Sequence, residues 1–351
     1  MQVKKLILVF SILLLALSLP LMATGAKEIL EEEKLSETVN SVDVATPNYA
    51  TVDKTDLIQA FNYAYSYMTV QSLYSQGISI NGAYWLRAID DAENMSDTSA
   101  FLLDTSEMES AISSYTTDYY QAGLKDDAGA ILSNEELANL STPETLLEKF
   151  SYAYSLIYTA QLKYMNGLDI SAPEFKQGAA DALYNVANPL MTTDECQSAV
   201  ENYAAKLDEE YEEYLKVVSE ENLKAAEEFL ATNKGNEEMI ELPSGDLMEI
   251  VSEDEELGAT PSETDSVIVD YDLYLLDGSE IDSGTDVTFD LQNLIPGFVE
   301  AVTNMKVGQE CYVYIHPDYG YGEQNTGTIP PQSLLVFRIY LKGIATPEVT
   351  E

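Results

Sequence analysis

Residues 267–344 contain several short stretches in which apolar and polar side chains alternate, and this pattern most limits how the chain can fold. The alternate positions that begin at Val267, at Val287, at Cys311 and at Leu335 are apolar or aromatic. Such a period of two is typical of strands that turn one face to a core. The segment therefore predicts an antiparallel sheet.

Two further signals lie between these stretches. Asp277-Gly278 has the composition of a tight hairpin turn. Phe298, Val302 and Met305 are spaced by four and by three residues, as on one face of a helix. We therefore expect a hairpin after the first strand and one short helix packed against the sheet.

An internal repeat precedes the sheet. FNYAYSYMTVQSLYSQGISI begins at Phe61, and FSYAYSLIYTAQLKYMNGLDI begins at Phe150, which is 150 minus 61, or 89, positions later. Each copy has an apolar stripe with steps of four, three and four residues: Leu57, Phe61, Ala64 and Met68, and then Leu146, Phe150, Ala153 and Ile157. The repeat also aligns Trp85 with Phe175, Asp91 with Asp181, and Arg87-Ala88 with Gln177-Gly178. The pattern predicts two similar sets of helices.

Helix starts are indicated by serine or threonine followed three residues later by glutamate, the spacing of a capping box. Ser141 with Glu144 and Thr192 with Glu195 have this spacing. After the second of these pairs, residues 194–233 keep a helical apolar period with acidic residues on the other face. The second copy is therefore expected to end in one long helix.

The N-terminal residues 1–26 combine Lys4-Lys5, an apolar run and small residues at the end, which predicts a cleavable secretory signal peptide. The alternative is a permanent anchor, but the run from Leu6 to Leu15 is shorter than the roughly 20 residues of a spanning helix. We expect an extracytoplasmic protein, periplasmic or secreted, with no membrane segment after cleavage. Residues 27–54 are acidic and predict a flexible linker.

Charge and rare residues exclude several classes of function. The chain has 17 Lys and Arg against 61 Asp and Glu, a net charge of −44, which disfavours nucleic acid and anionic lipid as partners. His316 is the single histidine, so a zinc site or a Ser/His/Asp triad is not expected. Cys196 and Cys311 lie in apolar phase, and we expect them to be free and buried, although one disulfide is arithmetically possible.

Four blocks in series, LDGSEIDSG, LIPGFVEAVTNMKVGQE, HPDYGYGE and IPPQSLLVFRIYL, resemble the FKBP-type peptidyl-prolyl cis-trans isomerase (rotamase) domain in order and spacing. The resemblance covers roughly residues 239–344. YAYS, GLDI and EFKQGAADAL resemble the helical domain that precedes it in secreted bacterial members such as the macrophage infectivity potentiator group. In that group the helical domain is a dimerisation and client-holding arm. The implied fold class is α+β, a tandem all-helical arm followed by an antiparallel sheet wrapped on a short helix.

These signals together divide the chain. The expected parts are the signal peptide at 1–26, the linker at 27–54, helical repeat 1 at 55–140, helical repeat 2 with the long helix at 141–235, the isomerase domain at 236–345, and a tail at 346–351.

The resemblance also implies the site. Tyr271, Asp282 and Tyr321 fall at catalytic positions, and the pocket positions are Leu294, Ile295, Phe298, Ile329 and Phe337. Tyr321 is expected to donate a hydrogen bond to a substrate carbonyl, Tyr271 and Asp282 to bond each other, and Phe298 to form the floor. Such a site needs no cofactor and no metal. The expected partners are unfolded or proline-containing polypeptides.

The sequence departs from the family at three pocket positions. The family commonly has tryptophan where Phe298 stands and phenylalanine where Ile281 stands, and Val287 replaces a common aromatic residue. Each change removes aromatic wall and predicts weaker catalysis. The leading interpretation is an isomerase that also assists folding; the alternative is a non-enzymatic chaperone, or holdase, with a weakened pocket.

The repeat leads to an expectation about assembly. Two arms tethered in one chain are at a high effective concentration for each other, so they are expected to pair within the chain. The alternative is domain swapping, in which copy one pairs with copy two of another chain.

Overall fold

The computed structural model describes residues 48–120, 128–165, 167, 168, 170 and 172–345. The expected signal peptide, residues 27–47 of the linker and the tail at 346–351 lie outside the described residues. The chain forms two compact units that divide between Tyr211 and Glu212. Within the described part of the chain, no helix is long and apolar enough to cross a membrane.

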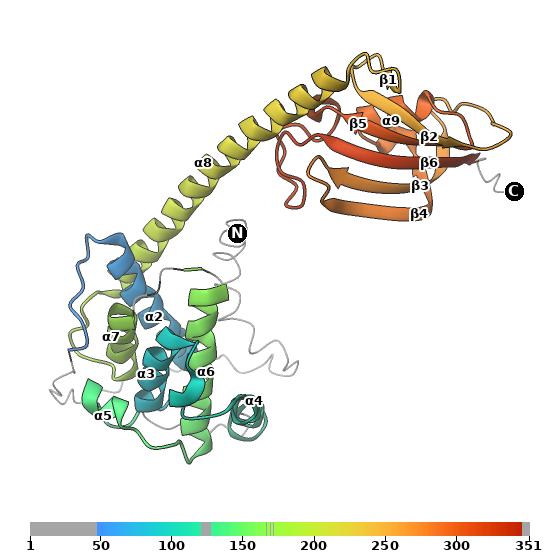
Figure 1. Ribbon diagram of the computed structural model, residues 1–351. Helices are drawn as coiled ribbons and strands as arrows, with labels where there is room; N and C mark the ends of the chain where they lie inside the picture. The colour runs from blue at the N-terminus through green and yellow to red at the C-terminus, as the bar shows by residue number, and fades with distance from the viewer. Residues whose placement is uncertain (1–47, 121–127, 166, 169, 171, 346–351) are drawn as a thin grey trace, which may run out of the picture. The chain divides into compact units, whose positions relative to one another are not determined.

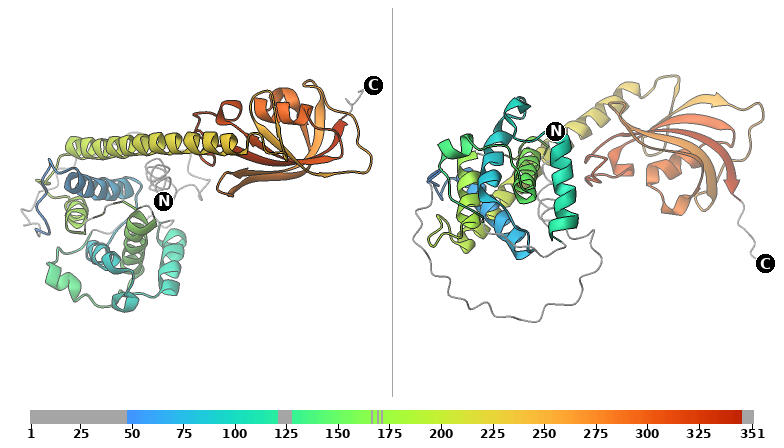
Figure 2. Two further views of the ribbon diagram at one scale, coloured as in Figure 1. Left: turned by 45° about the horizontal axis from the view of Figure 1, so that its top comes forward. Right: turned by 90° about the horizontal axis from the view of Figure 1, so that it is seen from below.

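The first unit is all-helical, as the repeat predicts (Figure 1 and Figure 2). Its α-helices are α2 (Leu57–Ser75), α3 (Gly82–Asp91), α4 (Thr105–Ser114), α5 (Asn134–Ala138), α6 (Leu146–Ala160), α7 (Ala172–Leu183) and the first part of α8 (Thr193–Asn233). Short 3₁₀ turns lie at Ala92–Asn94 and Thr98–Ala100, and π-helical turns extend α4 and α6 at Tyr115–Tyr120 and Gln161–Met165. Helices α2 and α6 occupy matching places in the two copies, and so do α3 and α7.

The helix starts were partly predicted. At the start of α8, the Thr192 hydroxyl accepts a bond from the Glu195 backbone N–H, and the Glu195 carboxylate accepts one from Thr192, so this capping box is confirmed. The box at Ser141 is wrong, because α6 starts one turn later with Thr145 as its cap and Glu148 as its partner. Both pairs have the spacing of a capping box. Thr145 directly precedes the apolar stripe, so burial of the stripe determines that the helix starts there.

The two copies pack across each other: α2 lies against α7, and α3 lies against α6. Aromatic pairs show the same packing between the copies. Phe61 of α2 stacks on Tyr203 of α8 with ring centroids 3.9 Å apart, and the aligned Phe150 of α6 stacks on Tyr115 at 3.6 Å. Each copy therefore buries its first helix against helices of the other copy.

Polar contacts follow the same relation. The buried Tyr63 donates from its hydroxyl to Asp181 at 2.5 Å, and the aligned Tyr152 donates to Asp91 at 2.7 Å. Thr69 and Tyr158 are 89 positions apart, the offset of the repeat, and their hydroxyl oxygens lie 3.1 Å from each other. Contact between equivalent positions is what an approximate two-fold axis between the copies requires.

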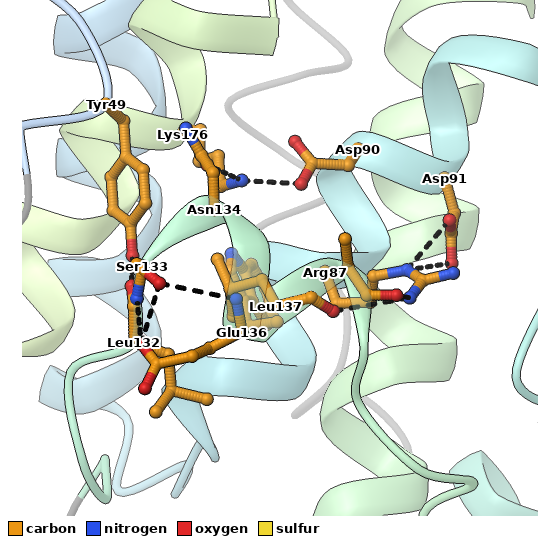
Figure 3. A network of polar contacts seen from close by, with 12 residues as sticks. Tyr49, Arg87, Asp90, Asp91, Leu132, Ser133, Asn134, Glu136, Leu137 and Lys176 are labelled. Carbon is orange, nitrogen blue, oxygen red and sulfur yellow. Dashed lines mark hydrogen bonds and ion pairs between the residues drawn. The ribbon is translucent and has the colours of Figure 1, made fainter.

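Two buried cations, one from each copy, bind the segment that connects the copies (Figure 3). Arg87 of α3 pairs with Asp91 at 2.9 Å and donates to the carbonyl of Ala138 at 2.8 Å. Lys176 of α7 pairs with Asp90 at 2.5 Å and donates to Asn134 at 2.7 Å. Burial lowers the pKa of Lys176 and raises that of Asp90.

The end of the predicted flexible linker is ordered, so that boundary is wrong. Tyr49 donates its backbone N–H to Gln177 at 2.7 Å and its hydroxyl to the carbonyl of Leu132 at 2.5 Å. Lys54 forms an exposed ion pair with Glu195 at 2.8 Å. Tyr49 supplies apolar area to the helical core, which the acidic composition around it concealed.

The second unit contains an antiparallel six-stranded sheet in the order β1-β2-β5-β6-β3-β4. The strands are β1 (Met239–Glu241), β2 (Leu247–Glu253), β3 (Ser266–Leu275), β4 (Glu280–Asp290), β5 (Gln309–Ile315) and β6 (Leu335–Ala345). Helix α9 (Pro296–Thr303) packs on its inner face, and 3₁₀ turns lie at Leu291–Asn293 and Pro317–Tyr319. The predicted alternation, hairpin and short helix are confirmed, except that Met305 is buried just beyond the helix end.

The edges of this sheet differ in length. β1 has three residues, whereas β4 has eleven and leaves the regular register with β3 at two places. Asp286 within β4 has a φ of 55°, a conformation that L-residues rarely adopt. The β4 edge is therefore long but irregular.

Helix α8 is one helix of 41 residues, and the predicted length of about 40 is confirmed. Its second part, from Glu212, belongs to the compact unit that contains the sheet. The boundary predicted at residue 235 therefore differs from the division found by packing, because an acidic amphipathic helix gives no sign of which unit its later turns contact.

Both cysteines are free and fully buried, as expected. Burial raises the pKa of each thiol to about 12, so Cys196 and Cys311 stay protonated at neutral pH.

Gly178→Ala is expected to destabilise the helical unit, because the new Cβ would lie 2.1 Å from the carbonyl oxygen of Tyr63 in α2. Overpacking costs about 1–3 kcal/mol, whereas alanine gains at most roughly 1 kcal/mol over glycine within a helix. Urea unfolding measures the difference. Ala88→Gly, at the aligned position of α3, is the matched control, with an expected loss of about 1 kcal/mol. A Gly178→Ala chain as stable as wild type would contradict this close approach.

Candidate active site

The inner face of the sheet carries an aromatic cluster built from three elements. Phe337 of β6 meets Phe298 of α9 edge to face, with ring centroids 5.2 Å apart. Tyr271 of β3 lies 6.5 Å from Phe337 on the neighbouring strand. The period of two in each strand directs these rings to one side, where α9 covers them. Phe298, the predicted floor residue, is 3% exposed and is part of this cluster.

Phe289 of β4 completes the cluster, although it was not among the predicted site residues. Its ring lies 5.3 Å from that of Tyr271 and 5.9 Å from that of Phe298. The alternation of Val287, Phe289 and Leu291 already placed Phe289 on the inner face. That alternation is the signal in the sequence that could have identified it as a site residue.

One polar pair stands at the edge of the aromatic cluster. The Tyr271 hydroxyl donates to the Asp282 carboxylate at 2.6 Å, so the predicted hydrogen bond is confirmed. Burial, together with this bond, raises the pKa of Tyr271 to about 12. Gly284 leaves room for the tyrosine ring, because a Cβ there would lie 2.8 Å from a ring carbon of Tyr271. The tyrosine is thus held neutral and in one orientation.

The other predicted positions surround this cluster. Ile329 is buried, Leu294 and Ile295 are partly buried against the same core, and Tyr321 is 37% exposed on the loop after β5. The backbone of that loop is fixed by a bond from the N–H of Gly322 to the carbonyl of Pro317 at 2.9 Å. The structure therefore brings all the predicted apolar residues into one core, with Tyr321 on the neighbouring loop.

This arrangement offers apolar surface with few polar groups. Among the described residues, no group of three or more His, Cys, Asp or Glu side chains could hold a metal ion. The rings and aliphatic side chains can exclude water from a bound group, while Tyr321 and the Tyr271–Asp282 pair supply the polar atoms nearby. Such a site suits a step without covalent chemistry.

Two family profiles match the chain. Residues 258–342 match the FKBP-type peptidyl-prolyl cis-trans isomerase family, and residues 147–248 match the domain amino terminal to FKBP-type peptidyl-prolyl isomerase. The curated FKBP-type peptidyl-prolyl cis-trans isomerase FkpA of Aeromonas hydrophila is 34% identical over 185 residues, 52% of this chain and 68% of that protein. The chain belongs to the FKBP-type peptidyl-prolyl cis-trans isomerases.

Two further relatives agree with this assignment. The FKBP-type 22 kDa peptidyl-prolyl cis-trans isomerase of Escherichia coli K12 is 32% identical over 213 residues, 58% of this chain and 100% of that protein. The outer membrane protein MIP of Legionella longbeachae is 29% identical over 202 residues, 56% of this chain and 85% of that protein. The predicted family and enzyme class are confirmed: the chain is a peptidyl-prolyl isomerase.

A buried carboxyl group lies beneath the loop that carries Tyr321 in this FKBP-type isomerase. Asp246, in the turn between β1 and β2, is fully buried and accepts a bond from the His316 backbone N–H at 2.7 Å. Its second oxygen has no hydrogen-bond partner. Burial raises the pKa of Asp246 to about 6, and the nearby Glu300 carboxylate adds to the shift.

Asp246→Asn is expected to stabilise the isomerase at neutral pH. Because folding raises the pKa of Asp246 above its usual 3.8, its contribution to stability is fully present below that pH and is lost as the pH rises through about 6. Asparagine keeps an acceptor for His316 and never ionises. Its advantage should grow by roughly 2 kcal/mol between pH 4.5 and pH 7.5 in urea unfolding. The exposed Glu323→Gln is the control; an advantage of Asp246→Asn that is equal at both pH values would refute the assignment.

Proposed function

We propose that the aromatic cluster accelerates isomerisation by removing water from the Xaa-Pro bond and holding it twisted. The barrier to rotation comes from amide resonance, which places negative charge on the carbonyl oxygen. Water stabilises this planar, polar form, so an apolar pocket disfavours it relative to the twisted transition state. The observation that carries the proposal is the cluster of Tyr271, Phe289, Phe298 and Phe337, with a single polar pair at its edge.

Each predicted residue has a role in this proposal. Tyr321 donates a hydrogen bond to the substrate carbonyl, and its partial exposure makes its hydroxyl accessible. Tyr271 and Asp282 orient one wall, Phe298 forms the floor, and Phe337 covers the proline ring. The remaining pocket residues, Leu294, Ile295 and Ile329, form the aliphatic walls.

Phe337→Ala is expected to lower kcat/KM more than Tyr321→Phe. Loss of one hydrogen bond amounts to about two- to tenfold, whereas an opened pocket admits water to the whole imide and should cost more than about tenfold. A protease-coupled assay on short Xaa-Pro peptides measures both rates.

Matched variants separate the pocket from stability. Leu341→Ala removes a buried side chain from the same strand, and Tyr319→Phe removes a neighbouring hydroxyl; both should retain activity. Chelators should have no effect. Equal activity in Phe337→Ala and in the wild-type chain would reject the assigned pocket.

The second candidate function is a non-enzymatic chaperone or holdase. Ile281 is partly buried against the core where the family commonly has an aromatic residue, and Val287 is likewise aliphatic. These substitutions reduce the aromatic wall. Two measurements on Phe337→Ala distinguish the functions: an isomerase assay, and suppression of the aggregation of a proline-free client. A holdase retains its full effect in this variant, whereas an isomerase loses activity.

We also propose that the protein acts outside the cytoplasm on unfolded, proline-containing polypeptides and assists their folding. The basic residues and apolar run within 1–26 support export, and one relative is named an outer membrane protein. The high negative charge keeps such a protein soluble in the presence of sticky clients.

We propose further that the two helical copies form an intramolecular pseudo-dimer, so that the protein is a monomer. The crossed packing of α2 with α7 and α3 with α6 supports this, and so do the paired tyrosine contacts. Arg87 and Lys176 hold the connection between the copies against them, which fixes one path of the chain.

Light scattering over a dilution series tests this state. The expected mass is that of one chain, at most 38.8 kDa. A stable species of twice this mass at nanomolar concentration would defeat the proposal.

Refolding of two tagged chains distinguishes a swapped dimer. Chains that carry different affinity tags, unfolded and refolded together, should not co-purify, because each chain pairs its own two copies. Co-purification would indicate domain swapping.

A further inference from the structure

The second part of α8 contacts β5 on the face of the sheet that lies opposite the aromatic cluster. Ala226 is fully buried, and the Phe229 ring lies 4.8 Å from that of Tyr314 in β5. One helical turn before Ala226, the Asn222 side chain donates from Nδ2 to the carbonyl of Pro331 at 2.9 Å. The helix thus contacts a loop as well as the sheet.

That loop, residues 329–333, is held in an unusual conformation. Gln332 has a φ of 57°, which is costly for a residue other than glycine and persists only where the surroundings impose it. The Ser333 hydroxyl donates to the carbonyl of Pro330 at 2.8 Å, and Asn222 also reaches this hydroxyl at 3.4 Å. Asn222 thus contacts the loop from outside at Pro331 and at Ser333.

The same loop is bonded to the loop that carries Tyr321. The backbone N–H of Gln332 donates to the carbonyl of Gly322 at 2.7 Å, one residue after Tyr321. Ile329, at the start of the loop, reaches the inner core. Hydrogen bonds and the short stretch of chain between them therefore connect Asn222 to the two loops that carry Ile329 and Tyr321.

We infer that Asn222 is a positioning residue of the isomerase site, through which α8 fixes the two loops that bear Ile329 and Tyr321. This inference rests on the proposed roles of those two residues. Asn222 touches no reacting atom and acts through its contacts with Pro331 and Ser333, which flank Gln332. Phe229 contacts Tyr314 of the sheet, whereas the amide of Asn222 contacts the loop.

Asn222→Asp tests the inference in the full-length chain, because aspartate has the same shape but cannot donate a hydrogen bond when ionised. We expect kcat/KM to fall by about three- to tenfold, the effect of one lost hydrogen bond, with most of the change in kcat. The amide proton of Gln332 should exchange faster with solvent, as measured by hydrogen exchange. Asn222→Ala should reproduce both effects.

Phe229→Leu is the control for a merely structural role. It weakens packing of the same helix on Tyr314 without removing a bond to the loop, so it should lower the melting temperature while kcat and Gln332 exchange stay at wild-type values. Activity that falls in proportion to stability in all three variants would overturn the inference.

The test also separates this inference from the pocket assignment. Wild-type activity in Asn222→Asp beside an impaired Phe337→Ala would reject the positioning role alone. Wild-type activity in Phe337→Ala would reject the pocket on which the role depends.

Discussion

Each set of helices buries its apolar stripe against the other set, and this packing between the two copies is the constraint on which the helical unit depends. Tyr63 and Tyr152 are both fully buried, and each finds its hydrogen-bond acceptor on a helix of the other copy. A buried tyrosine hydroxyl without an acceptor would be costly. The polar pairs therefore select the crossed arrangement over others that would bury similar apolar area.

The two copies have diverged, so their packing is not fully symmetric. Arg87 aligns with Gln177, and Lys176 has no cationic counterpart in the first copy, yet both cations serve the single connection between the copies. The chain has a single connection between the two copies, so the residues that bind it have no symmetric counterparts. Tyr49 and Lys54 likewise contact the second copy: Tyr49 donates its backbone N–H to Gln177, and Lys54 forms an ion pair with Glu195.

Much of the fold could be predicted because strand alternation and helical stripes record burial directly. The sheet, the hairpin at Asp277-Gly278 and the length of α8 are examples. The start of α6 could not be chosen, since Ser141 and Thr145 offer the same capping chemistry and tertiary burial decides. The order at Tyr49 and the packing of α8 beyond Glu212 depend on partners far away in sequence. In the site, family likeness identified the rings at Phe298 and Phe337, but Phe289 required strand phase and three-dimensional contact together.

The edges of the sheet have a consequence for an isomerase that acts on proline-containing polypeptides. An exposed strand edge offers unpaired N–H and C=O groups that an extended client can join as another strand, and such pairing leads to co-aggregation. β1 is too short to serve as a template. β4 is long, but Glu280, Asp282, Asp286 and Asp290 place charge along it, and its register breaks twice. The isomerase can thus bind polypeptides through its side chains, while its sheet edges are poor partners for an additional strand.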